Sequence, residues 1–301
     1  MSLRINTNVA ALNAYNNLQA NQASQEDAFE QLSSGLRINK AADDASGLAI
    51  SQGLTSQING LTQAVSNAND ATNVAQIADG ALGTTQNILQ RMRTLVVQAS
   101  NSGTQDTNSL SDIQQELSSL SSQLDSIAST TSFGGKKLLD SSYQGVFQVG
   151  ANGGETISLD LTSDTTGASQ KSFSAADLGV AANALSKTYT GTSTGTAAAK
   201  TLDVTAAGFN STAALSSLDT AINTVSSARA NIGATQNQLG YTVSNLQTAI
   251  TNVTASRSNL TDADLATEVT KMTQAQILTQ ATTSVLAQAN SAPQAILKLL
   301  Q

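Results

Sequence analysis

The sequence contains no cysteine and no histidine among its 301 residues. Without cysteine, a disulfide framework and thiolate metal sites are excluded. Without histidine, the chain lacks the commonest general base and the commonest metal ligand, and the His-Glu-x-x-His helix of zinc proteases cannot exist. These two absences argue against an enzyme and predict that the protein has no cofactor.

Large and charged side chains are also scarce. Aromatic residues make up 3% of the chain and charged residues 12%, there is no Trp and a single Pro, and much of the 40% hydrophobic fraction is alanine. Thin helical seams use such residues, whereas a wide globular core requires more bulky side chains. The composition therefore favours an elongated helical molecule.

Charge and hydropathy exclude two further classes of protein. A net charge of −7 argues against a nucleic-acid binder. No apolar run approaches the roughly 20 residues that a membrane span needs, which argues against membrane insertion. The first six residues lack the charged-then-apolar pattern of a signal peptide, so we expect any secretion to use a route without signal cleavage.

Both ends of the chain carry apolar residues at alternating spacings of three and four, the pattern of a coiled-coil seam. The N-terminal stripe comprises Ile5, Val9, Leu12 and Leu18. The C-terminal stripe comprises Leu278, Val285, Ala289, Ala292, Ile296 and Leu299. Pro293 is expected to kink or break the second helix. Because each stripe needs a cover, we predict that the N- and C-terminal helices pair.

The stretch 33–50 is expected to form a structured corner, in which one helix ends and the next begins. Gly35 can end a helix, and Asp43 or Asp44 can cap the next one, with Arg37 and Asn39 lying between them. Adjacent carboxylates can also indicate acid–base catalysis or a metal, but no histidine or further acidic cluster accompanies them. Capping is the preferred interpretation.

The middle of the chain contains long helical seams at 54–96, 110–127 and 215–260, and a switch to period two at 143–161 around a Gly-rich turn, which predicts a β-hairpin. The fold class is therefore mainly α, an elongated antiparallel coiled-coil helical bundle with a small β-hairpin region. Residues 163–210 are rich in Ser, Thr, Gly and Ala and suggest a variable surface segment, with a further hairpin at 189–204 and O-glycosylation left open.

These boundaries divide the chain into five stretches. We expect residues 1–42 and 262–301 to form an inner core domain, because they contain the two terminal helices. Residues 43–165 and 211–261 are expected to form the two halves of a helical shell domain. Residues 166–210 form the variable surface segment.

Short motifs at both ends resemble signatures of bacterial flagellins. They are LRINTN at residues 3–8, LSSGLRIN at 32–39 and SVLAQAN at 284–290. The resemblance covers about residues 1–160 and 211–301, and the short middle segment leaves no room for large outer domains. The chain is similar to a minimal flagellin.

The resemblance implies a structural subunit that polymerises with itself into the extracellular filament of the bacterial flagellum for motility. It implies unfolded export through the flagellar type III system and assembly at the tip. The implied partners are the flagellar cap, the hook-junction proteins and an export chaperone at the C-terminal helix. A hook–filament junction protein remains the alternative, because it shares the helical ends.

A further motif resembles the surface that vertebrate Toll-like receptor 5 reads in flagellins. It lies at residues 89–95 and 114–116, and implies recognition by Gln90, Arg91, Leu95 and Glu116. In the simpler interpretation, Arg91 and Glu116 solvate helix faces, while Gln90 and Leu95 line a contact between subunits. Both interpretations can hold together.

Overall fold

The structure is a computed structural model that describes residues 8–101, 103–141, 143–161, 172–181, 202–205 and 209–299, with the backbone alone from residue 292 onwards. The chain divides into two compact units. The terminal unit comprises Met1–Asn59 with Ile250–Gln301, and the central unit comprises Gly60–Ala249. The division falls within two long helices, whereas the sequence suggested boundaries at the corners near residues 42 and 262.

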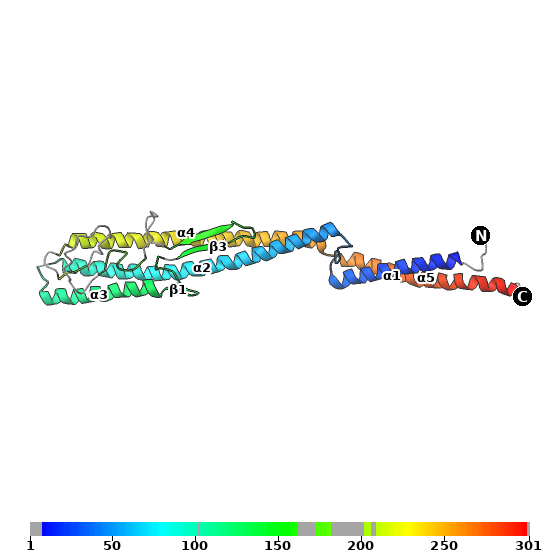
Figure 1. Ribbon diagram of the computed structural model, residues 1–301, viewed down its shortest axis with the longest axis horizontal. Helices are drawn as coiled ribbons and strands as arrows, with labels where there is room; N and C mark the ends of the chain where they lie inside the picture. The colour runs from blue at the N-terminus through cyan, green and yellow to red at the C-terminus, as the bar shows by residue number, and fades with distance from the viewer. Residues whose placement is uncertain are drawn as a thin grey trace, which may run out of the picture. The chain divides into compact units, whose positions relative to one another are not determined.

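The terminal unit is built on two antiparallel helices, α1 (Val9–Ser34) and α5 (Leu265–Leu299), which lie side by side (Figure 1). The predicted pairing of the N- and C-terminal helices is therefore confirmed. Asn8 caps α1 by accepting a hydrogen bond from the N–H of Ala11, and Gly35 ends it with a left-handed φ of 71°. Helix α5 continues through Pro293 to Leu299, so the expected break does not occur.

The central unit contains most of three helices, α2 (Ala45–Ala99), α3 (Thr107–Thr130) and α4 (Ser211–Thr261). Asp106 caps α3 and Asn210 caps α4 through side-chain oxygens. The three predicted seams meet in one core, where Leu82, Leu117 and Val225 are fully buried. The mainly helical fold is confirmed.

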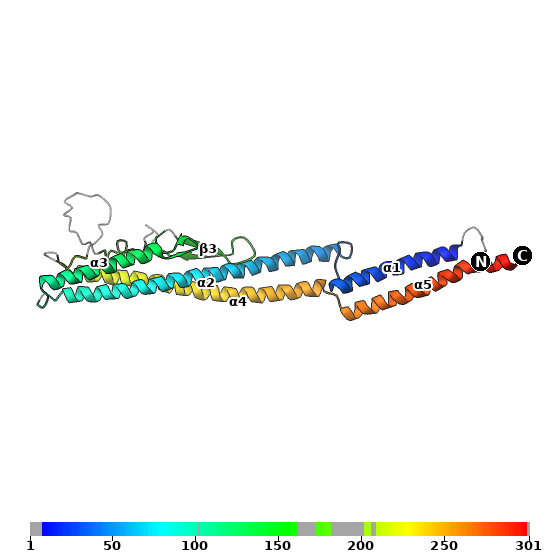
Figure 2. The same ribbon diagram turned by 90° about the horizontal axis from the view of Figure 1, so that it is seen from below.

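Two small antiparallel strand pairs lie beside these helices (Figure 2). Strands β3 (Gln144–Gln148) and β4 (Thr156–Asp160) form the predicted hairpin, whose Ile157 packs against Ala68 of α2 and Leu239 of α4. The pair β1 (Ser132–Phe133) and β2 (Lys136–Lys137) was not predicted. It turns through Gly134 and Gly135, both with positive φ.

Part of the expected variable surface segment belongs to the core. Phe173, Val180, Leu202 and Val204 are buried in the cluster that contains α2, α3 and α4. The backbone N–H of Phe173 donates to the carbonyl of Leu139, and the backbone N–H of Leu202 donates to the carbonyl of Ala181. These bonds connect the buried parts of the segment to each other and to the end of the β1–β2 region. The expectation of a purely surface segment was wrong here, because isolated apolar residues among Ser and Ala give no periodic signal. Most of the suggested hairpin at 189–204 lies outside the described residues.

Candidate functional surfaces

The seam between α1 and α5 is made of small and polar side chains. Ala14, Ala28 and Ala275 are the buried apolar residues along it. Asn21 Nδ2 donates to Thr282 Oγ1 at 3.0 Å, and Asn8 Nδ2 donates to the carbonyl of Ala289 at 2.8 Å. Such hydrogen bonds define the register of a pair whose alanines alone would specify it poorly.

Most of the larger aliphatic residues of the predicted stripes face outward. Val9 is 57% exposed, Leu12 55%, Leu278 43% and Val285 56%. The seam that is buried within the chain therefore has a different register from the expected one. Periodicity identifies an apolar stripe but does not tell whether the same chain or another molecule covers it.

The remaining stripe residues are placed in two ways. Leu18 and Ala289 are half-buried, and the carbonyl of Ala289 accepts the hydrogen bond from Asn8. Ile5 falls outside the described residues, as do the side chains of Ile296 and Leu299.

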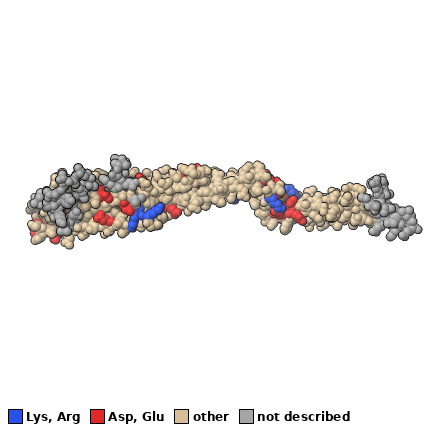
Figure 3. All heavy atoms as spheres, viewed as in Figure 1, with Lys and Arg blue, Asp and Glu red and all other residues tan. Residues whose placement is uncertain are grey.

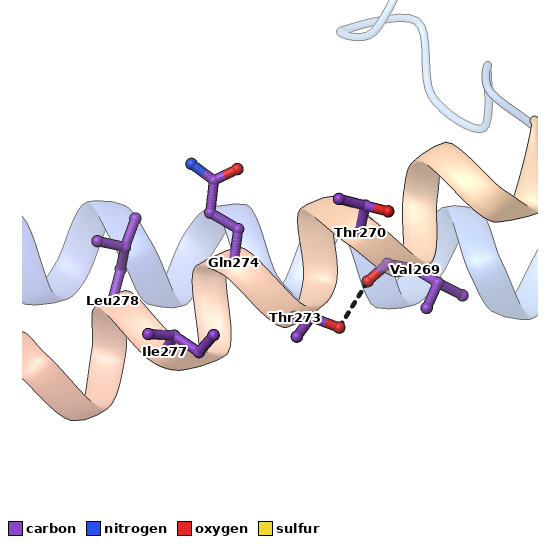
Figure 4. Close-up of a pocket in the computed structure, with 6 residues that line it drawn as sticks. All are labelled: Val269, Thr270, Thr273, Gln274, Ile277 and Leu278. Atoms are coloured by element: carbon purple, nitrogen blue, oxygen red, sulfur yellow. Dashed lines mark hydrogen bonds between the residues drawn. The ribbon is translucent and has the colours of Figure 1, made fainter.

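Helix α5 carries a groove of about 400 Å³ (Figure 4). The hydroxyl of Thr273 donates to the carbonyl of Val269 at 2.8 Å, so this polar group is satisfied within the helix. The groove therefore exposes methyl and aliphatic groups beside the amide of Gln274. Its lining residues are Val269, Thr270, Thr273, Gln274, Ile277 and Leu278.

Charge is absent from long stretches of both terminal segments. Residues 5–25 and 272–297 contain no Asp, Glu, Lys or Arg. Figure 3 shows the described charges of the terminal unit gathered in one patch, with an uncharged surface along the helices. The outward aliphatic side chains of α1 and α5 therefore lie on a surface without charge.

The charged patch coincides with the corner that joins α1 to α2. Arg37 donates from Nη2 to the carbonyl of Leu260 and from its backbone N–H to Thr261, both at 2.7 Å. The N–H of Ala263 donates to the carbonyl of Gly35 at 2.9 Å. These bonds hold the two corners of the terminal unit together.

Two carboxylates have separate capping roles at the first corner. Asp43 Oδ2 accepts from the N–H groups of Lys40 and Asn39 at 2.9 Å, which lowers the pKa of Asp43. Asp44 Oδ1 accepts from the N–H of Gly47 at 2.8 Å and caps α2. Both aspartates act on the backbone, as the capping interpretation expects.

The four residues of the receptor motif divide into an exposed group and a buried one. Gln90 and Arg91 are exposed on α2, and Arg91 forms an ion pair with Glu116 of α3 at 2.7 Å. Leu95 is only 2% exposed and packs in the central core. The side chains of Gln90, Arg91 and Glu116 are accessible to another molecule in the folded chain. The side chain of Leu95 is not accessible unless the chain unfolds.

Two further site types find no support in the described part of the chain. No three Asp or Glu side chains gather there in a way that could hold a metal ion. None of the described helices combines the length and the hydropathy of a membrane crossing.

Comparison with known proteins accounts for this architecture. Residues 5–144 match the family model of the bacterial flagellin N-terminal helical region, and residues 215–300 match that of the C-terminal helical region. The chain is 44% identical to the flagellin of Bacillus subtilis (strain 168), with 99% of this chain and 100% of that protein covered. It is 40% identical to the flagellin of Halalkalibacterium halodurans, with 99% of each chain covered.

Among solved structures, the crystal structure of Bacillus cereus flagellin aligns with 60% of this chain and 88% of its own, with 27% identity and a TM-score of 0.43. The sequence matches extend over both helical ends and the whole length of the curated relatives. The chain therefore belongs to the bacterial flagellins, structural proteins without enzymatic activity that polymerise into the extracellular flagellar filament.

Proposed function

We propose that this flagellin is exported unfolded through the flagellar type III system and joins the tip of the filament beneath the cap, where other copies cover the outward faces of α1 and α5. The observation that carries the proposal is the exposure of Val9, Leu12, Ile277 and Val285, which lie in the uncharged stretches 5–25 and 272–297. Exposed aliphatic faces of this kind mark protein–protein contacts.

The energetics of apolar burial support the idea that contacts with other copies order the terminal helices α1 and α5. Within one chain, the α1–α5 seam buries mainly alanines, which contribute little apolar area. Covering an aliphatic side chain contributes up to about 1.5–3 kcal/mol. Several such side chains per subunit are needed to offset the conformational entropy lost when two long helices become ordered. Polymerisation supplies that burial.

The same reasoning suggests what covers α5 before assembly. An export chaperone that binds the C-terminal helix would shield Val269, Ile277 and Leu278, which flank the groove of α5. At the base of the filament, the hook-junction proteins would meet the first subunits through equivalent terminal helices. Both partners are part of the proposal.

The test is seeded polymerisation of purified monomer, followed by negative-stain microscopy. The variant Ile277→Ser with Val285→Ser should lose filament growth, because it removes aliphatic groups from the outward face of α5. The control is Gln276→Ser with Gln288→Ser, at exposed positions of the same helix that carry no aliphatic group. Equal growth of both variants would contradict the assigned surface.

In the same experiment, the behaviour of the wild-type chain shows whether the protein is a filament subunit or a junction protein. A filament subunit propagates into long filaments from sheared seeds. A hook–filament junction protein would give rings or short stubs, and that outcome would overturn the proposal.

We further propose that Toll-like receptor 5 recognises Gln90, Arg91 and Glu116. The exposed ion pair between α2 and α3 supports this, because it presents both charges on one surface. Leu95 contributes by packing and not by contact. Arg91→Ala should lower activation of a receptor reporter, whereas Arg93→Ala, at the neighbouring exposed ion pair with Asp219, should retain it. Equal signalling by the two variants would refute the assignment.

A further inference from the structure

The sequence contains two Asn-Gly pairs, and the structure places them in different surroundings. Asn59 and Gly60 lie within α2, whereas Asn152 and Gly153 lie in the turn between β3 and β4. An asparagine followed by glycine readily loses its side-chain amide, because no Cβ hinders the approach of the glycine nitrogen. The two pairs have the same local chemistry, so the fold decides which of them reacts.

The backbone nitrogen of Gly153 is not restrained by the fold. Asn152 and Gly153 are both exposed. Among the residues that the structure describes, none accepts a hydrogen bond from the N–H of Gly153. A Cβ at Gly153 would meet no atom within 4 Å. The turn therefore has the freedom to bring this nitrogen to Cγ of Asn152.

Asn59 is in the opposite situation. In the interior of α2, the N–H of Gly60 belongs to the helical hydrogen-bond ladder, and the backbone torsions are fixed. Packing adds a second restraint, because a Cβ at Gly60 would lie 3.0 Å from the Cβ of Ala151. The nitrogen of Gly60 cannot approach Cγ of Asn59 without opening of the helix, so this pair is protected.

The side chain of Asn152 closes the turn through Glu155. Its Nδ2 donates to Oε1 of Glu155, and its backbone N–H donates to Oε2, both at 3.1 Å. The side-chain hydrogen bond, followed by the backbone one, lowers the pKa of Glu155. The carboxylate also lies over Gly150, where no Cβ would fit. Because both hydrogen bonds are exposed, water competes for them and the amide is released intermittently.

The closed turn rests on α2. Ala151 is half-buried, and its Cβ lies against Gly60. At the base of the turn, the N–H of Val149 donates to the carbonyl of Glu155 at 2.8 Å. A chemical change at Asn152 therefore acts on a turn that is packed on a helix of the central unit.

We propose that Asn152 is a deamidation site of this flagellin and that its deamidation opens the turn between β3 and β4. The nitrogen of Gly153 attacks Cγ of Asn152 and a cyclic imide forms. The Cγ–Nδ2 bond breaks, and the amide leaves as ammonia with the proton of the Gly153 N–H. Water then adds to one of the two imide carbonyls and opens the ring, which gives aspartate or isoaspartate at this position.

The product has a carboxylate where the amide donated to Glu155. The hydrogen bond to Oε1 is lost, and two negative charges face each other across the turn, which is unfavourable. Glu155 is therefore expected to leave its place over Gly150. The hydrogen bond between Val149 and Glu155 then opens more often, and the tip of the hairpin is loosened from α2.

Incubation of the full chain at mildly alkaline pH, as folded monomer and unfolded in urea, tests the site. Peptide mass spectrometry with an isoaspartate assay measures conversion at both Asn-Gly pairs. In urea, Asn59 and Asn152 should react at similar rates, whereas in the folded chain Asn152 should react and Asn59 should not. Equal conversion of the two residues in the folded chain, or none at Asn152, would overturn the proposal. The assay uses monomer, so its outcome is independent of filament assembly.

Gly153→Ala is the matched variant for the chemistry. Gly153 has no positive φ and has open space at its Cβ position, so alanine fits the folded turn. The added methyl group hinders ring closure. The variant should lose conversion at Asn152 and keep the unfolding transition of the wild type. Conversion at the wild-type rate would overturn the proposed reaction.

Asn152→Asp reproduces one product and tests the opening of the turn by amide hydrogen exchange. The N–H of Val149 should exchange about fivefold faster than in the wild type at the same pH, the order of magnitude that the loss of one hydrogen bond gives. The internal control is the N–H of Leu138, which donates to the carbonyl of Thr131 at 3.0 Å and should exchange at the wild-type rate. Unchanged exchange at Val149 would overturn the opening of the turn.

Discussion

The amide of Gln114 tests whether the segment after the hairpin is part of the core. Gln114 lies on α3 and is buried. Its Nε2 donates to the carbonyl of Leu202 at 3.1 Å, and its Oε1 accepts from the N–H of Val204 at 2.9 Å. One side chain therefore satisfies two backbone groups of the short segment that carries the buried side chains of Leu202 and Val204.

The expected cost of Gln114→Ala follows from those two bonds. Each buried backbone group left without a partner costs about 1–3 kcal/mol. Water admitted by the missing side chain recovers part of this. We expect Gln114→Ala to lower the free energy of unfolding of the central unit by about 2–4 kcal/mol.

Gln114→Glu gives a second signature with a defined sign. The introduced carboxylate keeps an acceptor for Val204 but loses the donor to Leu202, and burial without a cation raises the pKa of the new group. Its protonated form can donate again. The variant should therefore be most stable below the ordinary pKa of a glutamate and lose stability as the pH rises through the raised folded-state pKa.

The assay is thermal and denaturant unfolding of the monomer by far-ultraviolet circular dichroism. Gln115→Ala is the matched control, because Gln115 is the adjacent residue and its side chain is exposed. An exposed substitution of this kind changes stability by about 0.5 kcal/mol or less. If Gln114→Ala were as stable as Gln115→Ala, the segment at 202–205 would not be part of the core.

Two further predictions concern the receptor motif and the corners. Leu95→Ala should destabilise the central unit by about 2–5 kcal/mol in the same unfolding assay, because Leu95 is buried, whereas Arg91→Ala should leave stability nearly unchanged. At the corners, a side-chain hydrogen bond from Thr267 lowers the pKa of Asp264, and backbone hydrogen bonds lower that of Asp43. Their stabilisation is present above the unfolded value near 3.8 and lost as the pH falls through the lower folded values, so the protection factors of amides at the corners, which correct for the intrinsic exchange rate at each pH, should fall in acid. An acid-induced fall in protection that persists in Asp43→Asn with Asp264→Asn would contradict this.

Much of the helical architecture could be predicted from local patterns. The seams that bury Leu82, Leu117 and Val225 repeat every three and four residues, and the hairpin alternates at period two. The roles of Gly35 and the corner aspartates could be predicted from residue type alone, because few residue types adopt a left-handed φ or cap a helix. The terminal motifs led to the correct family.

The receptor motif shows where residue identity was insufficient. Gln90, Arg91, Leu95 and Glu116 matched the resemblance equally well as letters. Only the packing of α2 against its neighbours separated buried Leu95 from the exposed ion pair. A buried residue and an exposed residue can share a motif, because the stretch 89–95 runs through about two helical turns and so includes residues on both faces of the helix.

By itself, the sequence determined the helices, the hairpin and the pairing of the ends, since these follow from periodicity and capping. Tertiary structure alone decided which stripe faces which partner. In α1 and α5 the small residues meet, and the aliphatic ones face outward. It also brought Phe173 and Val204 into the core and left Tyr241 outside it. The physical reason is that a helix presents several faces with similar periodicity, and only the positions of the neighbouring elements determine which face is buried.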